Sequence, residues 1–275
     1  MFRRLTPVAK NILIINVVIL IVGSVLSQSG PDGRPTDPLV EFLGLRVVYS
    51  ELFAPYQFFT YMWLHGGTWH LIGNMIAVLV FAPMLEMVWG SKRFMIFYLV
   101  CGMGAGLLYG VADAVEKYPL KESINSYLEN PNPDEFYNLV LQAKSAGLSM
   151  GYLGYLGELS DNYYVNPAYE SQTIEEAEKI FYGVITRGNM VGASGAVFGI
   201  LFAFAFLFPN TELFLLFPPI PIKAKYLVFF YGMYELYSEF TRTPGDNVAH
   251  LAHLSGMLIA FILLKIWKND TRRFY

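Results

Sequence analysis

Charged residues and cysteines are both scarce in this sequence of 275 residues. Only 15% of the residues are Asp, Glu, Lys or Arg, and the single cysteine, Cys101, lies in an apolar run. One cysteine can form neither an intrachain disulfide nor a cysteine-based metal cluster, which excludes a disulfide-stapled protein. We expect Cys101 to be a small buried hydrophobe. The net charge of −3 and the lack of a basic block in any loop argue against nucleic-acid binding.

Apolar residues are abundant instead. They make up 55% of the chain, aromatic residues make up 16%, and the mean hydropathy is +0.41. This composition is far more apolar than that of an average soluble domain, and it excludes a disordered or fibrous protein. Six membrane helices of about 20 residues would use about 120 residues. We therefore predict an all-α polytopic membrane protein whose surroundings are the lipid bilayer.

Hydropathy predicts six membrane-spanning helices. Five runs are strongly apolar, and a further run near residue 230 is weaker and rich in tyrosine. The first run follows basic residues, as a secretory signal does, but no A-x-A site comes after it, so we interpret it as an uncleaved helix. The six runs cover residues 11–26, 71–89, 94–110, 190–208, 226–237 and 248–267.

The distribution of basic residues predicts the orientation in the membrane. With a cytoplasmic N-terminus, the short cytoplasmic segments hold 11 of the 19 basic residues, and the much longer exterior loops hold the other eight. The positive-inside rule then predicts that both termini are cytoplasmic. The 11 residues are Arg3, Arg4, Lys10, Lys92, Arg93, Lys223, Lys225, Lys265, Lys268, Arg272 and Arg273.

The same pattern divides the chain into three parts. Residues 1–111 form the first half of a membrane core, with a long exterior loop over 27–69 and a third span that Gly110 can end. Residues 112–189 are polar, carry 12 Asp and Glu, and are predicted to be an extramembrane insertion. Residues 190–275 form the second half of the core and a short cytoplasmic tail.

All four histidines fall near the predicted ends of spans. His65, His70 and Asn74 follow one another in a His-x4-His-x3-Asn pattern at the start of the second span, and His250 and His253 lie at the start of the sixth. His70 and Asn74 are four residues apart, so both project from one helix face. Polar groups at membrane depth are costly and therefore suggest a functional site.

A serine stands out in the same way. Ser194 lies in a Gly-Ala-Ser-Gly segment, 192–195, at the exterior end of the fourth span. Taken alone, such a serine is more often a packing residue than a nucleophile, and His253 alone could be an interfacial imidazole. However, Ser194, His253, Asn74 and His70 all lie within about 10 Å of the exterior ends of their helices. We expect them to share one pocket that opens outward.

The chemistry of such a pocket follows from its side chains. A serine hydroxyl needs a neighbouring base to become a nucleophile, and a neutral imidazole is suited to that role. Acyl transfer also needs hydrogen-bond donors where the oxyanion develops, and an Asn amide, a His N–H and the backbone N–H of Ser194 are available. Because the fourth and sixth spans contain no Asp or Glu, we predict a Ser/His dyad without an orienting carboxylate.

At these residues the sequence resembles the rhomboid family of intramembrane serine proteases, in the form of a bacterial member with a long insertion between the third and fourth spans. The order, the spacing and the predicted topology of the matching segments agree with that family. The segments are His-Gly-Gly-Thr-Trp-His-Leu-Ile-Gly-Asn at 65–74, Glu86 followed by Gly90-Ser91, Gly-Ala-Ser-Gly at 192–195, and Ala-His-Leu-Ser-Gly at 252–256.

The resemblance implies a six-helix bundle that cleaves transmembrane segments of other membrane proteins after a small residue near the exterior face. It implies no metal and no organic cofactor, and a location in the bacterial cell (inner) membrane. The implied roles are Ser194 as nucleophile, His253 as general base and acid, Asn74 and His70 as oxyanion donors, and Phe198, Gly192, Gly195 and Gly256 as supporting residues.

Rows of small residues predict close helix contacts. Spacings of four residues put each row on one helix face, and facing rows let two backbones approach closely. Such an approach would bring Ser194 and His253 together. The rows are Gly195, Gly199 and Ala203 in the fourth span, Ala252, Gly256 and Ala260 in the sixth, and Gly102, Gly106 and Gly110 in the third.

Two alternatives have specific signatures. A metal-dependent intramembrane hydrolase would use His65, His70, His250 and His253, but the sequence has no HExxH motif and no carboxylate beside these histidines. A non-catalytic relative that only binds membrane helices would lack the catalytic pair, and Ser194 and His253 are both present.

Overall fold

A computed structural model describes residues 5–29, 35–144, 148–214, 220–241 and 248–270. The described residues are mostly helical, and four helices are long and apolar enough to cross a membrane, with a shorter apolar helix, α9, beside them. This confirms the prediction of a helical membrane protein. The four long helices are α1 (Pro7–Leu26), α4 (Thr68–Trp89), α5 (Ser91–Glu129) and α11 (His250–Asp270); α9 covers Ser194–Leu207 and α10 covers Ala224–Thr241.

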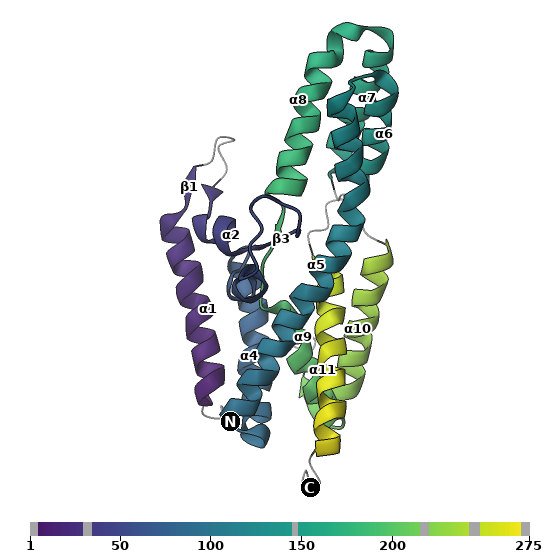
Figure 1. Ribbon diagram of the computed structural model, residues 1–275. Coiled ribbons are helices and arrows are strands. Elements are labelled where there is room, and N and C mark those ends of the chain that lie inside the picture. The colour runs from purple at the N-terminus through teal and green to yellow at the C-terminus, as the bar shows by residue number, and fades with distance from the viewer. Residues whose placement is uncertain (1–4, 30–34, 145–147, 215–219, 242–247, 271–275) are drawn as a thin grey trace.

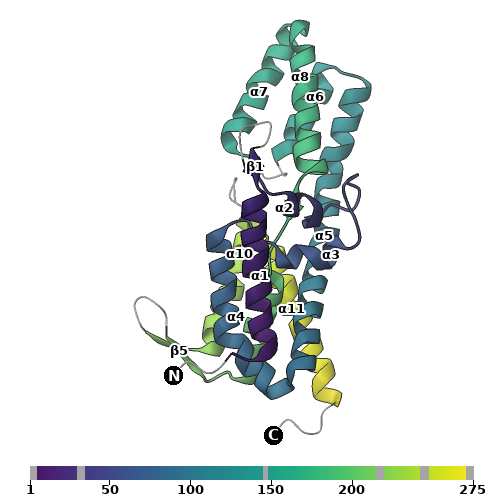
Figure 2. The same cartoon turned by 90° about the vertical axis from the view of Figure 1, so that its left-hand side faces the viewer.

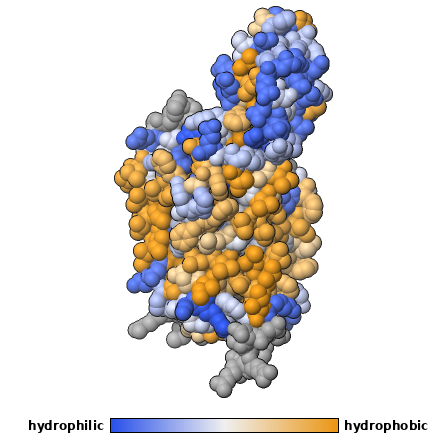
Figure 3. Space-filling model, viewed as in Figure 1, coloured by the Kyte–Doolittle hydropathy of each residue, from blue (hydrophilic) through white to orange (hydrophobic). Residues whose placement is uncertain are grey.

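These six helices form one elongated body (Figures 1 and 2). The start of α1 and the end of α11 lie at the same end of this body, and α6, α7 and α8 project from the opposite end. Figure 3 shows mostly apolar residues on the face of the body that is in view and mostly hydrophilic residues over the projecting end. The outer face of α1 is typical of the body, because Val18, Ile21 and Val25 are exposed there. Lipid can cover such a face without cost.

The expected close contact between α9 and α11 is confirmed. A Cβ atom built on Gly256 would collide with the backbone carbonyl oxygen of Gly195, and one built on Gly199 would lie 3.3 Å from the backbone carbonyl oxygen of Gly256. Cys101 is fully buried, as expected. The two backbones therefore approach to a separation that only glycine permits.

The glycine row of the third span is not matched by a facing row of small residues on another helix in the described part of the chain. It accepts large side chains from the loop between α1 and α4, and the Tyr61 hydroxyl donates a hydrogen bond to the carbonyl of Gly102 at 2.6 Å. The row thus anchors the loop to the bundle. The facing pairs are Met62 against Gly102, Tyr61 against Gly106, and Phe58 against Gly110.

The expectation that Gly110 ends the third span is wrong. Helix α5 continues without a break to Glu129, because a lone glycine costs a helix only about 1 kcal/mol. The extended part of α5 packs with α6, α7 and α8 around a second apolar core that is separate from the core of the body. The further elements here are α6 (Pro133–Ala143), α7 (Met150–Val165), η3 (Pro167–Tyr169), α8 (Glu170–Ile180) and η4 (Phe181–Thr186).

The core of the projecting part is bordered by a partly buried polar pair. The Tyr152 hydroxyl donates a hydrogen bond to Glu176 at 2.5 Å. Burial, together with this hydrogen bond to a carboxylate, raises the pKa of Tyr152. The pair joins α7 to α8.

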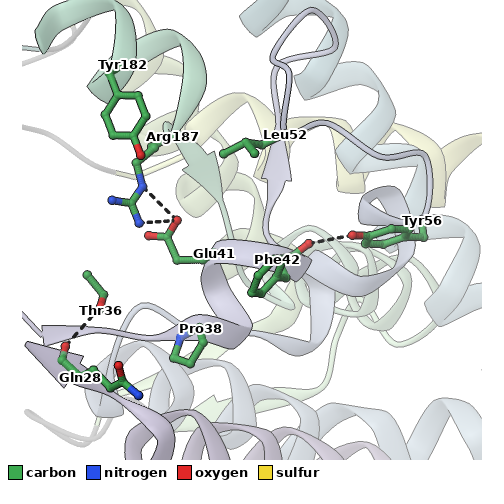
Figure 4. Close-up of a pocket in the computed structure, with 9 residues that line it drawn as sticks. All are labelled: Gln28, Thr36, Pro38, Glu41, Phe42, Leu52, Tyr56, Tyr182 and Arg187. Carbon is green, nitrogen blue, oxygen red and sulfur yellow. Dashed lines mark hydrogen bonds and ion pairs between the residues drawn. The ribbon is translucent and has the colours of Figure 1, made fainter. Parts of the chain in front are cut away.

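The loop between α1 and α4 holds the chain that returns from the projecting part. Strand β3 (Leu45–Arg46) pairs with β4 (Asn189–Met190), which directly precedes α9. Arg187 contacts Glu41 at 2.8 Å (Figure 4), and the buried Arg46 bonds the same carboxylate and the carbonyl of Thr186. The other loop elements are β1 (Gln28–Ser29), β2 (Pro35–Thr36), α2 (Pro38–Leu43), α3 (Gln57–Thr60) and η1 (Tyr61–Trp63).

At the opposite end of the body, Glu86 joins α1 to α4. Its carboxylate accepts hydrogen bonds from the backbone N–H groups of Val8 and Ala9, both at 3.0 Å, and from the Ser91 hydroxyl at 2.6 Å. A carboxylate at a helix N-terminus is favourable because those N–H groups lack partners within the helix.

Two short antiparallel strands, β5 (Glu212–Phe214) and β6 (Pro221–Lys223), lie between α9 and α10 in the chain.

Candidate active site

Ser194 is the first residue of α9, directly after a turn that requires glycine. Gly192 has φ = +136°, a conformation that side chains other than glycine rarely adopt. A Cβ atom there would lie 2.8 Å from the His70 ring and 3.6 Å from the Ser194 hydroxyl oxygen. The Ser194 hydroxyl and the His70 imidazole therefore flank the same small space.

Contacts with the loop between α1 and α4 hold this turn in place. The Gly192 N–H donates a hydrogen bond to the carbonyl of Tyr61 at 3.0 Å, and Met190 pairs with Leu45 in the β3–β4 ladder. The backbone N–H groups at the start of α9 have no partners within the helix and carry the positive end of its dipole. An oxyanion beside Ser194 would be stabilised there.

His70 and Asn74 lie one turn apart near the start of α4. The Gly66 N–H donates a hydrogen bond to Nδ1 of His70 at 3.4 Å, so the other nitrogen, Nε2, carries the proton in the neutral ring. That nitrogen would lie 2.9 Å from a Cβ on Gly192, beside Ser194. The side-chain nitrogen of Asn74 is buried and has no hydrogen-bond partner among the described residues. His70 thus offers one donor beside Ser194, and Asn74, one helical turn away, offers a second donor that is unpaired among the described residues.

His253 lies in the first turn of α11, with its ring flat against that of Phe198. The ring centroids are 4.1 Å apart and the planes differ by 7°. Phe198 is one of the supporting residues that the sequence resemblance implies. Stacking of this kind fixes the plane of the imidazole.

The expectation of a histidine without a carboxylate is wrong. Oε2 of Glu235, on α10, lies 2.8 Å from Nδ1 of His253 and 2.6 Å from Nδ1 of His250. Glu235 and His250 are both buried. Sequence reasoning missed Glu235 because it inspected the fourth and sixth spans, whereas Glu235 comes from the weak tyrosine-rich run. A charged residue within that run was the available signal.

The predicted residues meet in a single cavity of about 1270 Å³. Ser194, His253, Asn74 and His70 all line it, together with His250. The cavity also reaches the base of the projecting part, where its lining is charged. The charged lining residues there are Asp113, Glu116, Lys117 and Lys144.

Comparison with known proteins gives the family. The family model of the Rhomboid domain matches residues 53–268, which is more than half of the chain. The chain belongs to the rhomboid family. The matched region of this rhomboid protein contains all of the candidate site residues.

Curated relatives agree over shorter segments. The rhomboid chain is 40% identical over 85 residues to "RHOMBOID-like protein 6, mitochondrial", 34% identical over 53 residues to "RHOMBOID-like protein 1" and 36% identical over 53 residues to "RHOMBOID-like protein 5", all from Arabidopsis thaliana. These segments cover 30%, 19% and 19% of this chain. They span only 27%, 14% and 17% of the relatives' own lengths.

The histidines of this rhomboid protein do not gather as one metal site. Among the residues that the structure describes, Glu235, His250 and His253 form the group that could hold a metal ion. His65 instead packs edge-on against His70, with 5.0 Å between the ring centroids. The four-histidine site of the metallohydrolase alternative is therefore absent from the described residues. Glu235 does, however, place a carboxylate beside two of the four histidines.

Proposed function

We propose that this protein is an intramembrane serine endopeptidase that cleaves transmembrane segments of other membrane proteins. The observation that carries the proposal is that Ser194, His253, Asn74 and His70, which come from three different helices, line one cavity. Membership of the rhomboid family supports it. The bundle is proposed to cross the membrane six times, with α9 and α10 as its two less obvious spans.

Ser194 is the proposed nucleophile and His253 the general base. The imidazole takes the proton from the Ser194 hydroxyl as its oxygen attacks the scissile carbonyl carbon, and then gives that proton to the leaving amine. His253 then takes a proton from water as the water oxygen attacks the acyl-enzyme, and it gives that proton to the Ser194 oxygen as the acyl group leaves. The site needs neither a metal nor an organic cofactor for this chemistry.

Asn74 and His70 are the proposed oxyanion donors. An unpaired amide donor in a buried site costs about 1–3 kcal/mol, and a donor held ready for the transition state accounts for that cost at Asn74. The protonated Nε2 of His70 and the backbone N–H of Ser194 complete the set. All three donors act on the oxygen of the tetrahedral intermediate.

Replacing Asn74 by alanine is expected to lower kcat by about 10²-fold, which is typical when one oxyanion donor is removed. His70→Ala should act in the same direction, while the melting temperature of both variants stays near that of the wild type. The measurement is steady-state cleavage of a fluorogenic transmembrane peptide in detergent. Asn162→Ala, in α7, is the matched control. Wild-type kcat in both site variants would assign Asn74 and His70 to structural roles.

The active site is proposed to open to the exterior of a bacterial cell membrane, with both termini in the cytoplasm. The 11 to 8 division of basic residues supports this orientation. The common position of the start of α1 and the end of α11 (Figure 1) requires an even number of crossings, which agrees with six. The insertion would then lie outside the cell.

A fluorophosphonate probe tests nucleophile and orientation together. In detergent the probe should label Ser194, and prior dialysis against EDTA should leave the labelling unchanged, because no metal is involved. On spheroplasts a membrane-impermeant form of the probe should label equally well. No labelling in detergent would refute an activated serine. Labelling in detergent but not on spheroplasts would place the site on the cytoplasmic side.

A further inference from the structure

The imidazole of the proposed general base has a buried carboxylate at its other nitrogen. Oε2 of Glu235 lies 2.8 Å from Nδ1 of His253, and the Glu235 side chain is only 3% exposed. A carboxylate so far from water is costly unless its oxygen atoms accept hydrogen bonds. Here one oxygen faces two imidazoles, those of His253 and His250. Nδ1 of each histidine therefore has the Glu235 carboxylate as its hydrogen-bond partner.

We propose that Glu235 is the positioning residue of a Ser194–His253–Glu235 triad. The proposal rests on the proposed protease function and adds a member that contacts the base but not the substrate. Its part is to hold His253 in one tautomer and one rotation. His250 in turn holds Glu235.

The geometry restricts the His253 ring in two independent ways. Phe198 lies flat on the ring and fixes its plane, but stacking leaves the ring free to turn within that plane. The hydrogen bond from Nδ1 to Glu235 removes that rotation and keeps the proton on Nδ1. Nε2 is then the nitrogen with a lone pair, as a base for Ser194 requires.

The charge of Glu235 also suits the reaction. When the Ser194 proton moves to Nε2, the His253 ring becomes a cation, and the buried carboxylate beside it stabilises that cation. Glu235 itself stays ionised and takes up no proton. The transferred proton leaves with the amine product, so the cluster returns to its starting state.

The distances favour direct hydrogen bonds over a metal ion. Two ligands of a tetrahedral zinc ion, each about 2.0–2.1 Å from the metal, are about 3.3 Å apart. The two nitrogen–oxygen distances to Oε2 of Glu235 are 2.6 and 2.8 Å, which are hydrogen-bond distances. Hydrogen bonds thus account for the arrangement of Glu235, His250 and His253.

The test compares Glu235→Gln, Glu235→Asp and the control Glu212→Gln, which makes the same chemical change at an exposed carboxylate. Glu235→Gln should lower kcat by about 10⁴-fold with KM within about threefold, because losing the equivalent acid in a serine protease triad has an effect of this order. Glu235→Asp should recover to within about tenfold of the wild type. Cleavage kinetics and the rate of fluorophosphonate labelling, both per folded molecule, are measured.

Several results would overturn the triad. Wild-type kcat in Glu235→Gln, or a lower melting temperature with full activity per folded molecule, would make Glu235 purely structural. Loss of activity on EDTA dialysis with recovery on adding Zn²⁺ would make the cluster a metal site. A wild-type protein that neither cleaves nor labels would refute the proposed function itself, which is a different outcome.

A second measurement covers the case in which Glu235→Gln does not fold. Long-range ¹H–¹⁵N NMR spectra of ¹⁵N-histidine-labelled Ser194→Ala report the tautomer of His253 directly. The triad requires a proton on Nδ1 and a bare Nε2 in the neutral ring. The opposite tautomer would refute the positioning role.

Discussion

Replacement of Ser194 by alanine is expected to abolish cleavage of a transmembrane substrate, with a loss of at least about 10⁴-fold in kcat. His253→Ala should lose as much, because a serine without its base is not a nucleophile. The double variant should be no worse than either single one, since the two groups act as a unit. The measurement is single-turnover cleavage in detergent, followed over hours to detect residual activity.

Controls separate catalysis from folding in this experiment. Ser24→Ala changes an exposed serine of α1 that bonds only its own helix, and it should cleave as the wild type does. Both site variants should keep their melting temperature and still bind a substrate helix. Activity that persists in Ser194→Ala but disappears with a chelator would favour the metal-dependent alternative.

Replacing Gly256 by alanine should disable the enzyme without touching a reacting atom. The new methyl group would collide with the carbonyl oxygen of Gly195, which is backbone and cannot rotate away. The helices α9 and α11 must then separate, and Ser194 and His253 lie on those two helices. A displacement of about 1 Å costs about 10²-fold in rate, and overpacking costs about 1–3 kcal/mol of stability.

The matched control is Gly157→Ala, in α7, where a Cβ atom meets nothing within 4 Å. That variant should be as active as the wild type and as stable or more so, because alanine favours a helix. Melting temperature and fluorophosphonate labelling are measured for both. If Gly256→Ala labels and melts as the wild type does, the close contact of α9 and α11 is not what brings the catalytic groups together.

The two helices of this experiment also show which features the sequence could predict. Small residues spaced by four in two spans predict a close approach wherever they face each other, and the contact of Gly256 with Gly195 confirms it. The glycine row of the third span carries the same signal, yet it accepts Tyr61 and Met62 of the loop between α1 and α4. The spacing of small residues predicts a helix face that other groups can approach closely, but it does not predict which residues pack there.

The sequence by itself determined the membrane class, the strong spans and the candidate residues. Hydropathy is a local property, and a run of apolar residues has the same meaning in any fold. The Ser194 and His253 motifs are also local, because each is a short segment at a helix start. Their common depth followed from counting residues along each span.

The tertiary structure alone decided which side chains meet. Glu235 lies in the weakest predicted span, and only the packing of α10 against α11 brings its carboxylate to His253, 18 residues later. Similarly, Gly110 is a helix breaker by propensity, but α5 continues to Glu129 because its extension packs in a second core. Contacts between helices depend on rotation and crossing angle, which no local pattern encodes. A hydrogen bond between two spans therefore becomes visible only when the spans are packed.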